Sequence, residues 1–211
     1  MYLVTDPHHP VSHLVLHTLH TRRQPTLTTC PTHPTPITAA FLTCPGPHTP
    51  TTLPYALTHH TRHIVYLATT TPPDPLEDLI TRLTPTWTLL HPGPPASHAL
   101  RWAPLLRTGH LPTPRTHRPC PLVHEADLAD VAVAALTEPR HHTHRTYDLT
   151  GPHHLTEADQ IRILAQVLAL PAPTGPHRAP AHEPTTTIER LLGRPARSFR
   201  QWAADHAADL R

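Results

Sequence analysis

Four short, continuous apolar runs constrain the fold of this chain more than any other feature of its sequence. They read YLVT at residues 2–5, AAFLTC at 39–44, HIVYLAT at 63–69 and WTLLHP at 87–92. Apolar runs of this length are typical of strands that are covered on both faces, as in a parallel sheet. We therefore expect an α/β protein whose sheet lies between layers of helices.

Helical periodicity between these runs supports the same fold class. A further strand is expected in RTYDLTG, at residues 145–151, and Thr156 with Asp159 predicts a capping box at the start of a helix that continues through Leu168. Apolar residues also recur at the spacing of a buried helix face in residues 11–19, 76–83 and 128–135. Strands and helices therefore alternate along the chain.

The spacing of these elements predicts two domains and one gap. We expect a Rossmann-like, doubly wound core domain in residues 1–150 and a small helical substrate lobe, packed on that core, in residues 151–211. Residues 22–38 have room for one short strand, in TLTTC at 26–30, but not for a further helix and strand, since a βαβ unit needs about 30 residues. At least one helix–strand unit is therefore expected to be missing.

The composition excludes some classes of function. The chain has 30 Pro, 23 His, 6 Gly and a formal net charge of +2. Pro, His and Thr recur even in loops, so we attribute most of them to compositional bias. The small net charge argues against nucleic-acid binding. The widely spaced Cys30, Cys44 and Cys120 predict neither a disulfide framework nor a metal site. Without a leader sequence or an apolar run of membrane-spanning length, we expect a soluble, cytoplasmic protein with no membrane attachment.

Several stretches resemble the actinobacterial form of the NmrA-like atypical short-chain dehydrogenase/reductase family. WTLLHPG, at residues 87–93, is similar to the family's WTILRPG strand, and HEADLADVAVAALTEP, at 124–139, to its D-x-A-x-V-A-x-x-A-L-T-E-P helix. TYDLTGPHHLTEADQIRILAQVLALP and IERLLGRPARSFRQWAADHAADL resemble its closing segments. The resemblance implies a Rossmann-like domain, a small C-terminal substrate lobe, usually NAD(P)H, and a setting in secondary metabolism.

The first turn of that family, V-T-G-A-T-G-x-V-G, aligns with VTDPHHPVS at residues 4–12, and every glycine is replaced. Asp6 brings a negative charge that would repel a phosphate about 4 Å away by roughly 1 to 4 kcal/mol. Pro7 and Pro10 have no N–H with which to bind an anion. The missing unit would also supply much of the adenosine pocket. We therefore predict that no cofactor is bound, with NADPH as the alternative.

Ligands of open α/β sheets bind at the carboxyl ends of the strands, where titratable groups can act as general acids and bases. His91 takes the place of the arginine in the family's R-P-G, and Trp102 lies in the segment that covers the substrate pocket in relatives. The chain contains no lysine, so it lacks the superfamily's usual Tyr–Lys pair. The catalytic candidates are His91, Asp6, His9 and Thr70, and the substrate-binding candidates are Cys44, His48, Thr69 and Trp102. His141, His142 and His144 lie close together, but relatives have no metal in this loop and we expect none.

Three functions are compatible with these observations. The favoured hypothesis is a cofactor-independent acid–base enzyme that isomerises, dehydrates or cyclises a small, partly aromatic secondary metabolite. The second is an NAD(P)H-dependent reductase or an NmrA-like dinucleotide-sensing regulator with a rewritten phosphate loop. The third is a non-catalytic partner subunit of another enzyme, and a homo-oligomer is compatible with each of the three.

Overall fold

The computed structural model describes residues 1–29, 35–43, 61–68, 75–171 and 185–211. The chain divides into two compact units, one formed by Met1–Pro92 with Glu125–Leu149 and the other by Gly93–His124 with Thr150–Arg211. The sequence placed residues 93–124 in the first domain, whereas the structure groups them with the second unit. The physical reason is that apolar residues of this segment share a core with the helices near the C-terminus.

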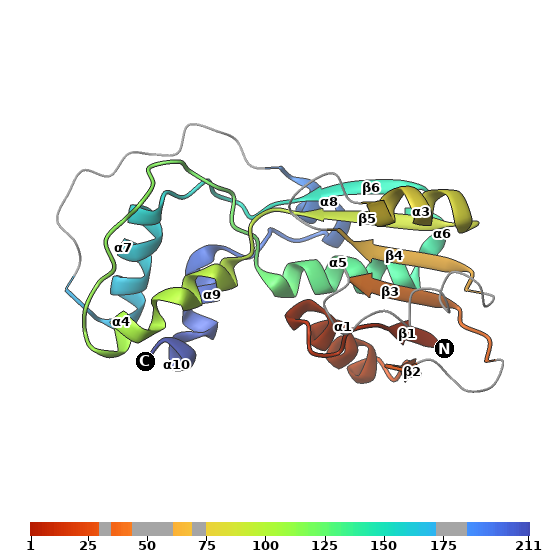
Figure 1. Cartoon of the computed structure of the whole chain (residues 1–211), viewed down its shortest axis with the longest axis horizontal. Helices are drawn as coiled ribbons and strands as arrows, with labels where there is room; N and C mark the ends of the chain where they lie inside the picture. The colour runs from red at the N-terminus through yellow and green to blue at the C-terminus, as the bar shows by residue number, and fades with distance from the viewer. Residues whose placement is uncertain (30–34, 44–60, 69–74, 172–184) are drawn as a thin grey trace. The chain divides into compact units, whose positions relative to one another are not determined.

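The first unit is built on a six-stranded sheet in the order β2-β1-β3-β4-β5-β6, which confirms the expected Rossmann-like α/β fold (Figure 1). Every described pair of neighbouring strands is parallel. The strands are β1 (Tyr2–Val4), β2 (Thr26–Leu27), β3 (Ala39–Thr43), β4 (His63–Leu67), β5 (Trp87–Pro92) and β6 (Arg145–Leu149). Strands β3 and β4 are buried along their whole length, as their continuous apolar runs predict.

Helices cover both faces of this sheet. In Figure 1, α3 (Pro75–Leu83) lies on one face, whereas α1 (Pro10–Thr21) and α5 (Glu125–Thr137) lie on the other. The short helix α6 (Pro139–His142) connects α5 to β6. Because side chains alternate along a strand, one set faces α3 and forms an apolar layer with Ile80. Members of that layer are Leu3, Ala40, Leu42, Ile64, Tyr66 and Leu89.

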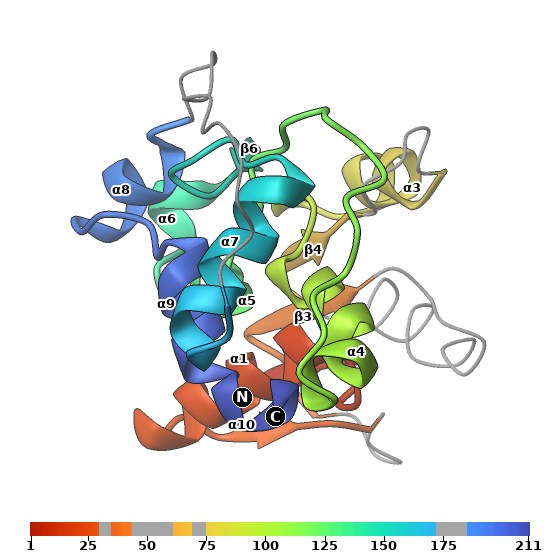
Figure 2. The same ribbon diagram turned by 90° about the vertical axis from the view of Figure 1, so that its left-hand side faces the viewer.

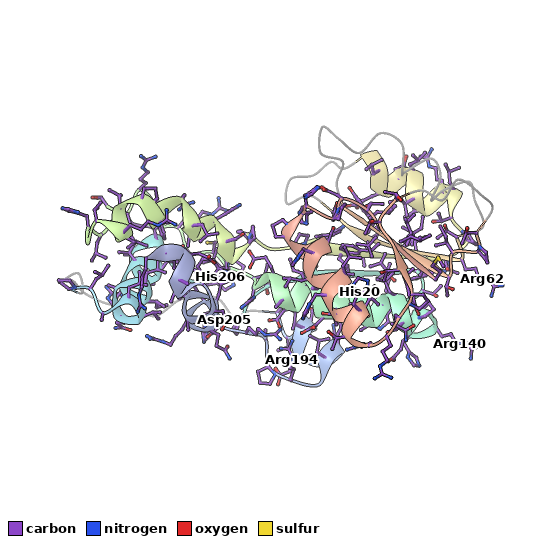
Figure 3. The ribbon with its side chains drawn as sticks, turned by 90° about the horizontal axis from the view of Figure 1, so that it is seen from below. His20, Arg62, Arg140, Arg194, Asp205 and His206 are labelled. Atoms are coloured by element: carbon purple, nitrogen blue, oxygen red, sulfur yellow. The ribbon has the colours of Figure 1, made fainter. Side chains whose placement is uncertain are left out.

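The stretch from residue 22 to 38 contains one two-residue strand, β2, and no helix among its described residues. The prediction that a helix–strand unit is missing is compatible with these described residues. His20, labelled in Figure 3, bonds through Nε2 to the Thr26 hydroxyl at 2.7 Å and so ties the end of α1 to β2. Among the residues that the structure describes, the sheet extends one strand beyond β1 on this side.

The second unit is helical, and Figure 2 views it with α4, α7, α9 and α10 facing the reader. Its elements are η1 (Ala96–Trp102), α4 (Ala103–Arg107), α7 (Glu157–Leu168), α8 (Thr187–Leu192), α9 (Phe199–Asp205) and α10 (Ala207–Leu210). The predicted capping box is confirmed, because the Thr156 hydroxyl accepts from Asp159 N–H and the Asp159 carboxylate accepts from Thr156 N–H. In the part of the chain that the structure describes, no helix is long and apolar enough to span a bilayer.

Candidate functional site

The order of the strands creates a switch point between β1 and β3. From β1 the chain runs through α1 to β2 on one side, and it then crosses to β3 on the other side. Thr5 extends the pairing beyond β1, since its N–H and its hydroxyl both donate to Phe41 O, at 3.0 and 3.2 Å. Ligands of open α/β sheets bind in the crevice at such a point, outside the carboxyl ends of the strands.

The turn after β1 keeps a glycine-like backbone although it contains no glycine. Asp6 has a φ of +47°, in the left-handed region that glycine adopts readily. Its carbonyl oxygen accepts the His9 N–H at 3.0 Å, which closes the turn. A non-glycine residue in this conformation costs about 1 kcal/mol. The tight turn that opens a dinucleotide site therefore exists here with an aspartate at the first glycine position.

His9 determines which hydrogen-bond donors the N-terminus of α1 can offer to an anion. The Val11 N–H donates to His9 Nδ1 at 3.3 Å, so a neutral His9 ring carries its proton on Nε2. Burial lowers the pKa of His9, while the nearby Asp6 carboxylate opposes this, so the ring is neutral at pH 7. Pro10 has no N–H, and Ser12 N–H is the remaining donor of the first turn. An anion at this helix terminus would therefore meet one backbone N–H and the His9 Nε2–H.

Two buried hydroxyls near the crevice have no hydrogen-bond partner among the described residues: Thr43 Oγ1 and Ser12 Oγ. Thr43 is the last residue of β3 and pairs in register with Leu67 of β4. An unpaired buried hydroxyl costs about 1 to 3 kcal/mol, so Thr43 marks a position where a polar ligand atom would be stabilising. Together with the left-handed turn, these groups fit a dinucleotide held by hydroxyls and imidazole, with fewer backbone donors than a glycine-rich turn offers.

His91 lies between two carboxylates at the end of β5. Its Nε2 is 3.0 Å from Glu77 Oε1 on α3, without hydrogen-bond geometry, and its Nδ1 is 3.7 Å from Asp148 Oδ1 on β6. The side chain is 35% exposed, although its Nε2 is buried against Glu77. The sequence analysis missed Glu77 and Asp148. Pairing β5 with β6 would have aligned Asp148 with His91, because the two residues are in register.

The predicted site residues fall into separate groups. Asp6 and His9 share one turn and interact electrostatically. His91 is three strand spacings away, on β5, which corresponds to about 14 Å at roughly 4.8 Å per strand. The structure therefore does not unite His91 and Asp6 in one acid–base pair. The other first-unit candidates, Cys44, His48, Thr69 and Thr70, lie outside the described residues.

Trp102 belongs to the second unit, where it is 8% exposed and packs in the helical core. The Arg101 guanidinium lies over its ring, 4.5 Å from the centroid. Trp102 also lines a cleft of about 710 Å³ within this unit. The residue thus has both a packing role and a surface that a ligand can reach.

The three histidines near β6 have separate partners. His141 Nδ1 is 3.3 Å from Glu138 Oε2, His142 Nδ1 is 3.0 Å from Tyr147 Oη, and His144 Nε2 is 3.1 Å from Pro85 O. Among the described residues, no group of three or more His, Cys, Asp and Glu side chains is arranged to hold a metal ion. These histidines lie at the start of β6, the edge of the sheet opposite the crevice.

The fold is shared with solved structures of reductases and of sugar-nucleotide epimerases. The NADPH-dependent quinone oxidoreductase of Escherichia coli superposes with a TM-score of 0.74 and 14% identity, covering 97% of this chain and 99% of that one. The triphenylmethane reductase of Citrobacter superposes with a TM-score of 0.72 and 15% identity, covering 98% of each chain. No family model matches the chain.

A comparison of sequences finds a relative of higher identity, the (4-alkanoyl-5-oxo-2,5-dihydrofuran-3-yl)methyl phosphate reductase of Streptomyces griseus. The two sequences are 31% identical over an alignment of 188 positions, and the match covers 69% of this chain. The match spans 66% of the relative's length, just under two thirds.

These comparisons overturn two expectations. The cofactor-independent isomerase, dehydratase or cyclase is wrong, because the sequence relative is a reductase and the structural neighbours include an NADPH-dependent reductase and NAD-bound proteins. The expectation that no cofactor is bound is wrong for the same reason, and one of the matching structures, with a TM-score of 0.68, is a complex with NADPH. The error lay in equating the loss of glycines with the loss of the turn, since Asp6 adopts the left-handed conformation without glycine.

Proposed function

We propose that this chain is an NADPH-dependent reductase of the NmrA-like short-chain dehydrogenase/reductase type, with a rewritten phosphate loop, acting on a small molecule. The observation that carries the proposal is the switch point between β1 and β3, where the left-handed Asp6 and the unpaired Thr43 hydroxyl lie at neighbouring strand ends. The 31% identity with a reductase supports the same reaction class.

NADPH is proposed in preference to NADH because of the residues that follow β2. Sites for NAD commonly place a carboxylate here to bind the ribose 2′-hydroxyl. The described residues after β2 are Thr28 and Thr29, and neither has a carboxylate. In this proposal, the His9 Nε2–H, Ser12 N–H and Thr43 hydroxyl hold the dinucleotide.

Reduction of a polarised double bond requires a hydride and a proton. The bound dinucleotide would supply the hydride. We assign the proton to His91, since the chain has no lysine for a Tyr–Lys pair and His91 is partly exposed at the same edge of the sheet. Glu77 and Asp148 position the ring and give it a route for taking up a replacement proton. Thr70 remains a predicted catalytic residue, and Cys44, His48, Thr69 and Trp102 remain predicted substrate contacts.

The relative's name suggests the substrate class to examine first. That enzyme acts on an unsaturated, phosphorylated lactone that carries an acyl chain. We propose that this chain reduces a small electron-poor alkene or carbonyl compound of related chemistry. A cytoplasmic location, a setting in secondary metabolism and a homo-oligomeric or partner-bound state remain predictions.

The test is direct. Purified protein is titrated with NADPH and with NADH while cofactor fluorescence is followed, and oxidation of NADPH is then measured with unsaturated lactone phosphates. We expect saturable binding that favours NADPH. In His91→Gln, turnover should fall by about 10²- to 10⁴-fold with the Kd for NADPH unchanged. His98→Gln, at an exposed position, is the matched control. Failure of both cofactors to bind at millimolar concentration would refute the proposal.

A further inference from the structure

The second unit contains a cleft of about 710 Å³ that the proposed chemistry does not use. Its lining residues come from η1, α4, the loop after α4 and the first residue of α7, all of which belong to this unit. Its walls include Arg101, Trp102, Leu105, Pro112, Arg115 and Glu157. These residues combine two guanidinium groups with an apolar surface, which is the chemistry of a site for an amphipathic anion.

Glu157 organises the cationic wall of this cleft. Its Oε1 pairs with Arg101 Nη2 at 2.7 Å. Its Oε2 accepts the N–H groups of Arg115 and Thr116, at 2.5 and 3.1 Å. The Glu157 side chain is 13% exposed, whereas that of Arg101 is 50% exposed. One carboxylate therefore holds Arg101 in place and fastens the backbone of Arg115 to the start of α7.

The charge of the surrounding segment favours an anion. Residues 93–124 contain four arginines and no Asp or Glu. Of the two arginines in the cleft, Arg101 is neutralised by Glu157, whereas the Arg115 guanidinium has no ion pair among the described residues. The cleft thus carries one uncompensated positive charge, and a guanidinium can bind a phosphate or carboxylate with two parallel hydrogen bonds.

The apolar part of the cleft indicates that its ligand also has an apolar part. Leu105 lines the cleft and is 46% exposed, so it offers apolar surface to a ligand. Trp102 and Pro112 also contribute apolar surface to the cleft. A ligand that covered Leu105 would remove this surface from water and gain free energy in proportion to the apolar area buried. Inorganic phosphate alone would leave the apolar wall exposed.

We propose that this cleft binds the anionic end of an organic phosphate or carboxylate through Arg115 and Arg101, with the apolar part of the same molecule against Leu105 and Trp102. The identification of that molecule as the substrate rests on the proposed reductase function. The binding itself does not, because all the residues that carry it belong to the second unit.

The experiment is isothermal titration calorimetry of the full chain with n-octyl phosphate, octanoate, n-octanol and inorganic phosphate. Octyl phosphate or octanoate should bind at least about tenfold more tightly than octanol or inorganic phosphate. The tighter of the two anions identifies the head group. Arg115→Gln should weaken binding of that anion by about tenfold or more. Arg118→Gln removes the same charge from the same loop outside the cleft and should leave the affinity within about twofold.

Other outcomes would overturn the proposal. Equal weakening in the Arg115 and Arg118 variants would mean attraction by net charge alone, and octanol binding as tightly as octyl phosphate would exclude a role for the guanidinium groups. A Leu105→Gln variant should weaken octyl phosphate and leave inorganic phosphate unchanged. NADPH titration of each variant separates the two proposals, since anion binding without NADPH binding refutes the reductase, and the reverse result refutes this cleft.

Discussion

His63 should make the first unit sensitive to acid. The side chain is 1% exposed at the start of β4, with Nδ1 3.0 Å from the Thr86 hydroxyl and Nε2 3.0 Å from the Thr88 hydroxyl. Burial is the main reason that the pKa of His63 is lowered to about 4, and the neighbouring His142 and His144 contribute to it. The folded state therefore holds this ring neutral under conditions where the unfolded chain protonates it.

The sign and size of the effect follow from proton linkage. Below the ordinary histidine pKa of about 6.5 the unfolded chain binds more protons at this site, so the stability present at higher pH is lost as the pH falls toward 4. With these two pKa values, the loss between about pH 8 and about pH 4.5 is roughly 2.5 kcal/mol. This is a large part of the stability of an ordinary domain.

The assay is urea unfolding followed by circular dichroism at both pH values, for the wild type and for His63→Gln. Glutamine keeps groups that can bond to the Thr86 and Thr88 hydroxyls but does not titrate. We expect the wild type to lose about 2.5 kcal/mol more than this variant, whereas His13→Gln, at an exposed position of α1, should behave as the wild type. Parallel pH profiles for wild type and His63→Gln would show that the two hydroxyls stabilise the protonated ring as much as burial opposes it.

Two further changes test particular backbone positions. Asp6→Gly should tighten NADPH binding several-fold, because it removes a carboxylate next to the phosphate site. If charge is the cause, Asp6→Asn should give most of the same gain. Unchanged Kd values for NADPH in both variants would contradict the proposed position of the phosphates. Gly151→Ala should destabilise the second unit by about 3 kcal/mol or more, since a Cβ would lie 1.8 Å from Leu122 O. In the control Gly109→Ala, where the added Cβ meets no atom within 4 Å, thermal unfolding should change far less, by the cost of a positive φ alone.

Much of the fold could be predicted because strands that are buried on both faces of a sheet have continuous apolar sequences. The runs at residues 39–43 and 63–67 have no polar alternation, and both are buried strands. The capping box at Thr156 was predictable because its two hydrogen bonds are local. The prediction of a missing unit before β3 rests on chain length alone, since too few residues remain for a helix and a strand.

The candidate site was less predictable because it depends on conformation and on contacts between distant segments. A sequence that lacks glycine does not exclude a left-handed residue, and Asp6 adopts that conformation. The carboxylates beside His91 come from residues 14 positions before it and 57 positions after it, so only strand order and helix placement bring them together. Glu157 likewise holds Arg115 through a backbone N–H, a contact without a side-chain signature.

The Thr43 hydroxyl offers the sharpest test of the switch-point site, because its two possible roles predict different combinations of results. Thr43→Val keeps the shape of the side chain and removes a buried hydroxyl that has no partner among the described residues, so the protein without cofactor should gain about 1 to 2 kcal/mol in its free energy of unfolding. If the hydroxyl also contacts the dinucleotide, NADPH should bind about tenfold more weakly to the stabilised variant, since one hydrogen bond of roughly 1.4 kcal/mol is lost. A rise in stability together with weaker NADPH binding is not expected of a hydroxyl that is only a packing defect.

Val65→Ala, at a buried position of β4 away from the strand ends, is the control, because it should lower stability without a specific effect on the Kd for NADPH. A Thr43→Val protein that is more stable and binds NADPH as the wild type does would remove this hydroxyl from the site and leave the cofactor to the turn around Asp6 and His9.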